Sequence, residues 1–415
     1  MACVNKKAVT FLAIAIMSVS TAFGSGYQLN EHGARAVSMG GAFVARAWDA
    51  SAIYFNPAGL SYVQGFNVML GGTLILPNTT FTGPYPNNTE WKMNSISFFP
   101  PNAYVSYNFN NGFAAGIGVF TPDGLGTDWP QNWVGRFIIT KINLQSFNIN
   151  PTVSYAFGDF ISIGVGFDYA LGSVLLEKYN PTPFSDATGN PITPFIHMQG
   201  DANGTGYNFG IMLKPIKNVS VGFSYRSKID FKTTNGNATF SQAGVLAGLL
   251  PGGAVSTSLP FPENWYAGIA YKGENYSVEA DFQHVGWSAY RQLNITFANH
   301  TTLQQNSSII GDYSDTYIIR AGGEYNLDKM WTLRAGVFYD KNPIPDAYDA
   351  PILPDADRLG LNAGVGVNLT NHLAVDASYM FLPFKQRTIT TSAYGFNGTY
   401  NTTANLIGID LSYRL

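Results

Sequence analysis

The chain has 415 residues, of which 46% are hydrophobic, 14% aromatic and only 12% charged, with a formal net charge of −3 and a mean hydropathy of +0.01. A soluble domain usually carries about 25% charged residues, and a helical membrane protein is far more hydrophobic than this chain. Low charge, many aromatic residues and 44 glycines are typical of a membrane β-barrel. The net negative charge argues against a nucleic-acid partner, since no basic patch is available to neutralise phosphates.

Residues 1–24 have the pattern of a cleaved export signal. Two lysines precede an apolar run at residues 8–19, and Ala22–Gly24 supplies small residues at the positions that a signal peptidase reads. A transmembrane anchor is the alternative, but the apolar run is shorter than the ~20 residues that a helical span needs. Cys3 is the only cysteine and lies in the predicted signal, so the mature chain, from about Ser25, has no thiol for disulfides, zinc ligation or catalysis.

Residues 25–65 come next and show no strand pattern. Asp49 can cap a short helix from Ser51 to Phe55, and Asn56-Pro57 ends it because proline lacks an amide donor and restricts the preceding residue. Ala58 and Gly59 then allow a close backbone approach. We expect this segment to plug a barrel formed by residues 66–415, and an open pore is the alternative. For the turn at Asn56–Gly59, the alternative to a gating role is an ordinary turn that leads into the first strand.

The rest of the chain alternates with a period of two. From Ile161 to Ala170, one face carries large apolar residues and the other carries small or charged ones, and the runs from Val219 and from Trp331 repeat this pattern. Such alternation is the dyad repeat of a lipid-facing barrel strand, although a soluble β-sandwich also alternates.

Six short polar turns separate pairs of alternating runs, while longer polar segments such as 180–203 and 233–260 lie between them. The turns are Asn110–Gly112, Gly158–Asp159, Ile216–Asn218, Gly273–Asn275, Leu327–Lys329 and Thr370–His372. Six turns join twelve strands, and the runs from Phe66 and into Leu415 add two. The sequence therefore predicts an all-β, transmembrane antiparallel barrel of about fourteen strands, in which the last strand pairs with the first.

The third strand is irregular. It starts at Phe113 and then meets Thr121, Pro122, Asp123 and Gly124. Proline cannot donate to a ladder and glycine favours a bend or bulge, so a kink is expected here. The alternative is that the strand ends before Thr121 and a loop follows.

The longest predicted loop contains Val245, Leu246, Leu249 and Leu250, which are spaced for one face of a helix. An apolar patch facing water marks a binding site; packing of this helix on its own barrel is the alternative. Twelve charged positions are expected to face the lumen and to form salt bridges that hold the plug: Arg226, Lys228, Asp230, Glu279, Asp281, Arg320, Glu324, Arg334, Asp340, Asp376, Asp410 and Arg414.

Four segments resemble the FadL/TodX-type outer-membrane transporters, which carry long-chain fatty acids or aromatic hydrocarbons. Ser25–Leu60 resembles the N-terminal hatch of that family, Trp133–Phe157 its fourth strand, Leu259–Leu293 its eighth and ninth strands, and Tyr339–Gly364 its eleventh and twelfth. Together these segments span most of the predicted mature chain.

The resemblance implies a fourteen-stranded barrel with a lumenal hatch in the bacterial outer membrane. Hydrophobic cargo (a fatty acid, hydrocarbon or detergent) would land on the outer loops and leave sideways beside the kinked third strand. The resemblance also implies that the turn Asn56–Gly59 packs against that strand and gates the opening. A fifth-strand cation holds the carboxylate in fatty-acid carriers; here Lys178 is the nearest cation, so neutral hydrocarbons are also plausible cargo. Outer-membrane lipid, lipopolysaccharide and the assembly machinery are expected partners of a monomer.

No catalytic, metal or cofactor site is expected. The five histidines do not have metal-ligand spacing, and His284 with Ser288 is the only nearby pair that could suggest a hydrolase. A general porin for polar solutes and a structural or adhesive barrel remain the rival functions.

Overall fold

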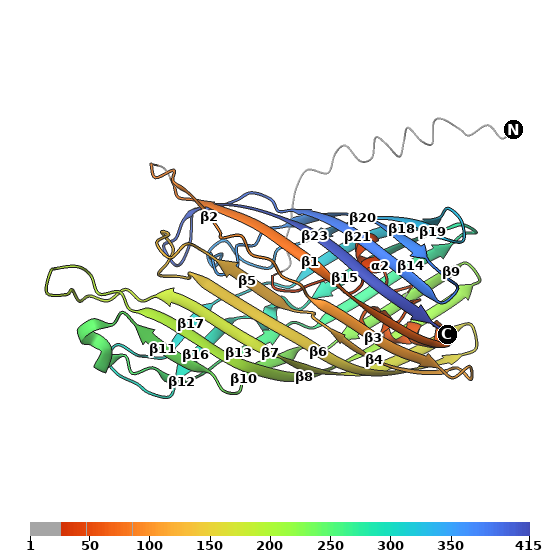
Figure 1. Ribbon diagram of the computed structural model, residues 1–415, viewed down its shortest axis with the longest axis horizontal. Helices are drawn as coiled ribbons and strands as arrows, with labels where there is room; N and C mark the ends of the chain where they lie inside the picture. Colours follow the sequence, from red (N-terminus) through yellow and green to blue (C-terminus); the bar gives the residue numbers. More distant parts are fainter. Residues whose placement is uncertain (1–25, 47, 85) are drawn as a thin grey trace.

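The computed structural model describes residues 26–46, 48–84 and 86–415, which form a closed antiparallel barrel of fourteen strands (Figure 1). β1 (Phe66–Thr82) pairs with β23 (Gly398–Arg414) from Asn67 opposite Arg414 to Thr82 opposite Thr399, and this ladder closes the wall. The predicted fold class is confirmed. The predicted export signal, 1–24, lies outside the described residues.

The wall strands between β1 and β23 follow chain order. They are β3 (Pro101–Asn108), β4 with β5 (Phe113–Phe120 and Gly124–Asp128), β6 (Lys141–Phe157), β7 (Ile161–Tyr179), β8 (Phe195–Ile216), β9 with β10 (Val219–Arg226 and Ile229–Thr233), β13 with β14 (Ser258–Phe261 and Asn264–Lys272), β15 (Tyr276–Val285), β18 (Thr316–Asn326), β19 (Trp331–Asp340), β20 (Arg358–Asn368) and β21 (Leu373–Pro383).

Short turns join these strands at one end, on the right of Figure 1, and all six predicted turns lie there. The other end carries the long connections, which we call the long-loop end. Those connections contain β2 (Glu90–Lys92), β11 (Asn237–Ser241), η2 (Gly244–Leu249), β12 (Gly253–Ser256), η3 (Trp287–Ala289), β16 (Gln292–Phe297), β17 (Ser307–Ile310) and β22 (Arg387–Ile389).

The predicted alternation decides which side chains face outward. On β7, Val165 and Phe167 are about half exposed while Ser162 and Asp168 are fully buried. Lys228 and Asp230 were expected to face the lumen and instead lie exposed, paired with each other at 3.0 Å. The reason is the interruption between β9 and β10, which shifts the alternation by one residue, so that Ile229 points inward.

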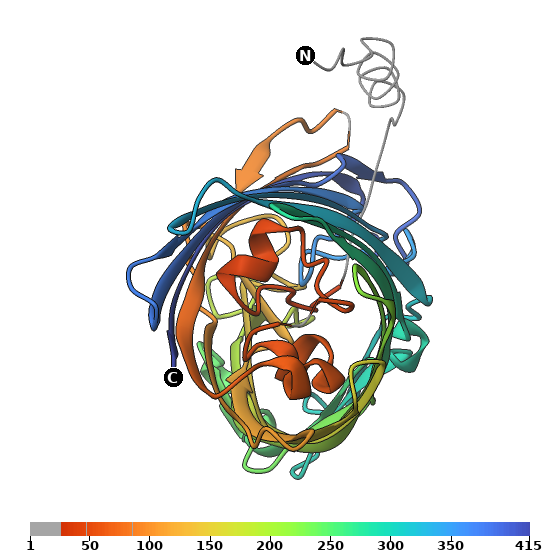
Figure 2. The same ribbon diagram turned by 90° about the vertical axis from the view of Figure 1, so that its right-hand side faces the viewer.

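The lumenal segment, residues 26–65 without residue 47, lies inside the barrel in the end-on view of Figure 2. It forms α2 (Ala34–Ser38), α3 (Ala52–Phe55) and the 3₁₀ helix η1 (Pro57–Tyr62). Asp49 Oδ1 accepts a hydrogen bond from the Ser51 amide at 3.0 Å, but Ser51 is the N-cap residue of α3 and that helix has no side-chain cap, so the predicted cap by Asp49 is wrong. None of the helices in the described residues is long and apolar enough to cross a membrane.

Candidate functional site: a wall break and the interior cavities

The third strand of the wall is interrupted between β4 and β5. β4 pairs with β3 on one side and β6 on the other, whereas the ladder of β5 runs along β6 alone. The pairing of β3 with β4 ends at Ala103 opposite Val119. Pro122 lies in the interruption and has no amide to donate, which explains why the ladder stops here. The predicted irregularity at Thr121–Gly124 therefore coincides with a break in the wall.

The chain before β3 does not fill this break, because it stays bonded to β1. Phe98 and Ile75 exchange both backbone hydrogen bonds, at 2.8 and 3.0 Å. The far end of the break is closed by the Asn94 amide, which donates to the Asp128 carbonyl at 2.8 Å. The ring of Phe98 lies over Gly126, where any Cβ would collide with it. The break is thus a bounded opening that is covered by an aromatic side chain.

The start of the lumenal segment occupies the free edge of the kink. The Leu29 amide donates to the Pro122 carbonyl at 2.8 Å, and the Gly124 amide donates to the Tyr27 carbonyl at 2.9 Å. The Gly26 amide donates to the Asp355 carboxylate at 2.7 Å, which ties the same segment to the loop between β19 and β20. Sequence reasoning missed these contacts, since no local pattern shows which distant edge a short segment will pair with.

The predicted gating turn contacts β7 and β8 as well as the third strand. The Asn56 side chain is fully buried and donates to the Val44 carbonyl at 2.8 Å and to Ile211 of β8 at 3.2 Å. The Ala58 carbonyl accepts from Ser162 of β7 at 2.9 Å, and a Cβ on Gly164 would collide with Pro57. The hydrogen bonds of the turn thus reach β7 and β8. The turn also lies against the third strand at β4, where Ala58 and Phe120 belong to one apolar cluster, whereas the edge at Pro122–Gly124 is bonded to Tyr27–Leu29.

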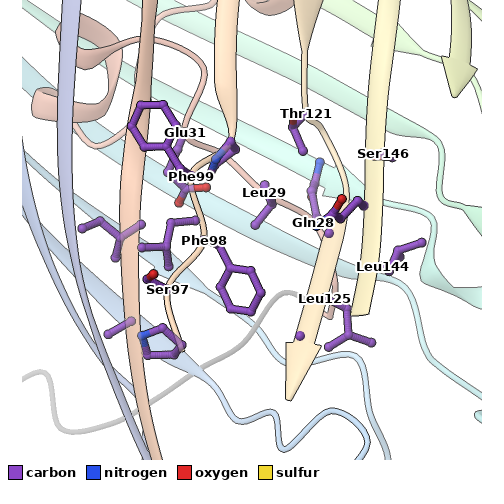
Figure 3. A pocket seen from close by; sticks show the side chains of 18 of the residues that line it. Gln28, Leu29, Glu31, Ser97, Phe98, Phe99, Thr121, Leu125, Leu144 and Ser146 are labelled. Atoms are coloured by element: carbon purple, nitrogen blue, oxygen red, sulfur yellow. The ribbon is translucent and has the colours of Figure 1, made fainter. Parts of the chain in front are cut away.

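An inner cavity of about 330 Å³ lies behind the break. Figure 3 shows Phe98 and Phe99 on one side of it and Leu125 and Leu144 on the other, with Leu29 of the lumenal segment between them. Phe99 is 58% exposed on the outer surface, so the cavity extends from the lumen to the wall.

Two further cavities continue toward the long-loop end. A neck of about 60 Å³ is lined by Tyr27, Phe231 and Tyr290 and shares Leu125, Leu144 and Leu353 with the inner cavity. An outer cavity of about 330 Å³ shares Leu176, Ile309 and Ile352 with the neck. The three cavities form one mainly apolar series from the long loops to the break.

Lys178 lines the outer cavity. Its side chain is partly buried, and among the described residues it has no hydrogen bond or ion pair. A partly buried cation without a partner can hold the carboxylate of an otherwise apolar molecule.

The predicted capture residues divide into two pairs. Val245 is 86% exposed and Leu249 39% exposed, while Leu246 and Leu250 are buried against Ile192. The single apolar face predicted for all four is wrong, because the segment forms a short 3₁₀ helix instead of an α-helix. The exposed pair alone remains available to a molecule arriving from solution.

Salt bridges hold the lumenal segment to the wall. Glu324 of β18 accepts from Arg35 at 3.1 Å and from Arg46 at 2.5 Å, both in the lumenal segment, and from Arg334 of β19 at 3.1 Å. Arg334 also pairs with Asp376. Across the residues that the structure describes, no group of three or more histidine, cysteine, aspartate or glutamate residues is arranged to hold a metal ion.

Comparison with known proteins identifies a family. The model of the outer membrane protein transport protein family (OMPP1/FadL/TodX) matches residues 15–415. The chain is 27% identical over 441 residues to the long-chain fatty acid transport protein of Escherichia coli K12, with 97% of each chain covered, and 25% identical to a 47 kDa outer membrane protein of Pasteurella multocida over the whole of both chains.

Solved structures show the same fold. A FadL homologue of Pseudomonas aeruginosa superposes with a TM-score of 0.81 at 20% identity, covering 94% of this chain and 100% of that one. The toluene transporter TodX of Pseudomonas putida gives 0.74 at 18% identity, covering 93% and 99%. Since the family match spans nearly all of the sequence, the chain belongs to the OMPP1/FadL/TodX family of outer-membrane transporters for hydrophobic compounds.

Proposed function

We propose that this protein takes up hydrophobic molecules passively, by capture at the long-loop end, passage through the three cavities and sideways release through the wall break. The long-loop end is then extracellular. The observation that supports this most directly is the inner cavity, which reaches from Leu406 inside the barrel to the exposed Phe99 in the wall. Long-chain fatty acids and aromatic or aliphatic hydrocarbons are the cargo classes whose apolar parts fit the lining of the three cavities.

Energetics favour a sideways exit. Moving an apolar molecule from a protein cavity into water costs about 25 cal/mol for each Å² of surface exposed. Release into the lipid beside β5 avoids this cost, because one apolar environment replaces another. The polar short-turn end, where the lumenal segment and its salt bridges lie, offers no such environment.

Capture would begin on Val245 and Leu249, which are exposed on η2. Lys178 would then hold a carboxylate where the cargo has one, and the apolar chain would enter the neck between Tyr27 and Phe231. The exposed apolar belt of the barrel would contact outer-membrane lipid and lipopolysaccharide. We expect insertion by the outer-membrane assembly machinery and function as a monomer.

Gating would depend on the lumenal segment. While Leu29 and Tyr27 remain bonded to Pro122 and Gly124, the backbone of the segment occupies the edge of the break. Movement of Tyr27–Leu29 would widen the opening, and the Asn56–Gly59 turn would keep the remainder of the segment anchored on β7 and β8.

Lateral release is tested by repairing the break. The double variant Pro122→Thr, Gly124→Val restores an amide donor and strand-forming residues at the kink, and should reduce uptake of a hydrophobic cargo by roughly tenfold or more. Glu90→Val, on the exposed strand β2 and outside the proposed route, is the control. Unchanged uptake of the hydrophobic cargo by the double variant would contradict lateral release. If the double variant loses uptake of small polar solutes to the same extent, the protein is a porin.

The cargo itself is identified from protein purified out of the native membrane, by extraction and mass spectrometry of bound molecules. Lys178→Gln should reduce capture of a fatty acid but not of a hydrocarbon of equal length, whereas Lys92→Gln on the exposed β2 should change neither. Equal loss of both cargoes would show that Lys178 does not recognise a carboxylate.

A further inference from the structure

The inner cavity contains a buried carboxylate that forms no ion pair with any residue the structure describes. Glu31 lines the cavity and is only 7% exposed. One of its oxygens, Oε2, accepts the Asn30 amide at 2.9 Å. Apart from the backbone amides of Asn30 and of Glu31 itself, no described residue donates to this carboxylate, and Glu31 forms no ion pair within 4.0 Å among the described residues. Figure 3 shows Glu31 beside Leu29 and Phe99, within the lining of the cavity.

The cation that lines the same cavity is already compensated. Arg358 donates to Asp340 at 3.1 Å, and its guanidinium lies over the ring of Phe384. Burial raises the pKa of Glu31 above its usual value, and the charges of Arg358 and Arg320 oppose that rise. In its ionised form, Glu31 would repel a second negative charge and would accept a hydrogen bond from a donor.

We propose that Glu31 makes the inner cavity selective for cargo whose polar end donates a hydrogen bond and carries no negative charge, such as an alkanol, a phenol or an alkylamine. This inference rests on the proposed function, because it requires cargo to enter the inner cavity. A donor group that reaches the ionised carboxylate of Glu31 forms a charge-assisted hydrogen bond. A carboxylate in the same place meets a like charge in an apolar environment.

The two ends of the route therefore have opposite preferences. Lys178 at the outer cavity attracts a carboxylate, while Glu31 at the inner cavity excludes it. A fatty acid anion would be captured outside and would pass inward poorly, whereas a neutral molecule would pass both positions.

The test compares three probes of equal chain length: a C16 alkanol, a C16 alkylamine and a C16 carboxylate. Their binding to the full-length protein in lipid nanodiscs is measured at about pH 8, where the free carboxylate is ionised and the amine is protonated. Lys178→Gln serves as the background, so that discrimination by the outer cavity is removed. Glu31→Gln keeps an oxygen that can accept the Asn30 amide, and Glu90→Gln, on the exposed β2, is the matched control.

We expect Glu31→Gln to shift the amine-to-carboxylate affinity ratio toward the carboxylate by roughly tenfold or more, which is the effect of one charge-assisted hydrogen bond. Glu90→Gln should leave the ratio unchanged. An unaltered ratio in Glu31→Gln, or weaker carboxylate binding, would overturn the inference. If Glu31→Gln does not fold, the affinities of the Lys178→Gln protein for the amine and the carboxylate are compared instead. Equal affinities would contradict selection by Glu31.

Failure of this inference differs from failure of the proposed function. Transfer of the neutral alkanol from solution into the lipid of the nanodisc or of a vesicle tests the route itself. If the wild-type protein does not accelerate that transfer, the route is wrong whatever Glu31 does. If transfer is accelerated and the ratio does not move, only the role of Glu31 is wrong.

Discussion

Glu324 holds the lumenal segment in the barrel, and Glu324→Gln is the perturbation that tests this. The carboxylate accepts hydrogen bonds from Arg35, Arg46 and Arg334. Glutamine has the same shape but no charge, so the three arginines lose one shared counter-ion. Arg35 still has Asp49 at 3.6 Å, and Arg334 still has Asp376 at 2.5 Å.

The buried charge of Arg46 determines how much stability Glu324→Gln should lose. Arg46 is fully buried, its only ion pair within the described residues is with Glu324, and its Nε and Nη1 atoms have no hydrogen-bond partner. Removing one member of a buried ion pair costs about 3–5 kcal/mol, because the other charge is left uncompensated. We expect Glu324→Gln to lower the free energy of unfolding by an amount in this range, while Glu90→Gln on the exposed β2 should change it by less than about 0.5 kcal/mol.

The assay is urea unfolding in lipid vesicles, combined with proteolysis of the lumenal segment and single-channel conductance in planar bilayers. Glu324→Gln should make the segment sensitive to protease and raise the conductance, since its anchor is weakened. The double variant Arg46→Met, Glu324→Gln should recover part of the loss, because the buried charge is gone. Wild-type stability in the single variant, or a double variant as unstable as the sum of the two single ones, would refute the reasoning.

Three other predictions test the structure. Gly164→Val should displace the lumenal segment, because its Cβ would collide with Pro57, and a lower melting temperature than that of Gly248→Val, which has open space, would show it. Val245→Asp, at an exposed position, should weaken binding of a hydrophobic cargo without changing stability, whereas Leu246→Asp, at a buried position, should destabilise the loop. Cargo binding and the melting temperature are measured for both variants. If the two variants change both quantities equally, the assigned exposures are contradicted. Burial raises the pKa of both Asp349 and Asp355 to about 7, so the contribution of these groups to stability is fully present below their unfolded pKa near 4 and is lost as pH rises through about 7. The melting temperature should therefore fall between pH 5 and pH 8 by more in the wild-type protein than in Asp349→Asn, Asp355→Asn, and identical pH profiles would contradict this assignment.

Local patterns in the sequence were sufficient for the barrel. The alternation from Ile161 to Ala170 predicts which side chains face lipid, and the six short turns predict strand pairing, because both signals act over a few neighbouring residues. The strand count, the closing pair of β1 with β23 and the break at Thr121–Gly124 all follow from such signals. The outward direction of Lys228 and Asp230 was missed, since the strand interruption that reverses them leaves the alternation otherwise intact.

The candidate site depended on contacts between distant parts of the chain. Residues 25–65 could be recognised as unlike a strand, but the pairing of Tyr27–Leu29 with Pro122–Gly124 joins segments about a hundred residues apart and has no periodic signature. The same holds for Gly26 with Asp355, and for the packing of Asn56–Gly59 on β7 and β8.

The sequence by itself determined the class of this protein: a low-charge chain with dyad repeats and short turns has to bury its backbone hydrogen bonds in a closed barrel, because lipid cannot satisfy them. Tertiary structure alone decided where the lumenal segment meets the wall and which cavity-lining charges form no ion pair among the described residues, Lys178 at the outer cavity and Glu31 at the inner one. The physical reason is that a partner for a charge is a matter of distance in space, and closure of the barrel sets that distance.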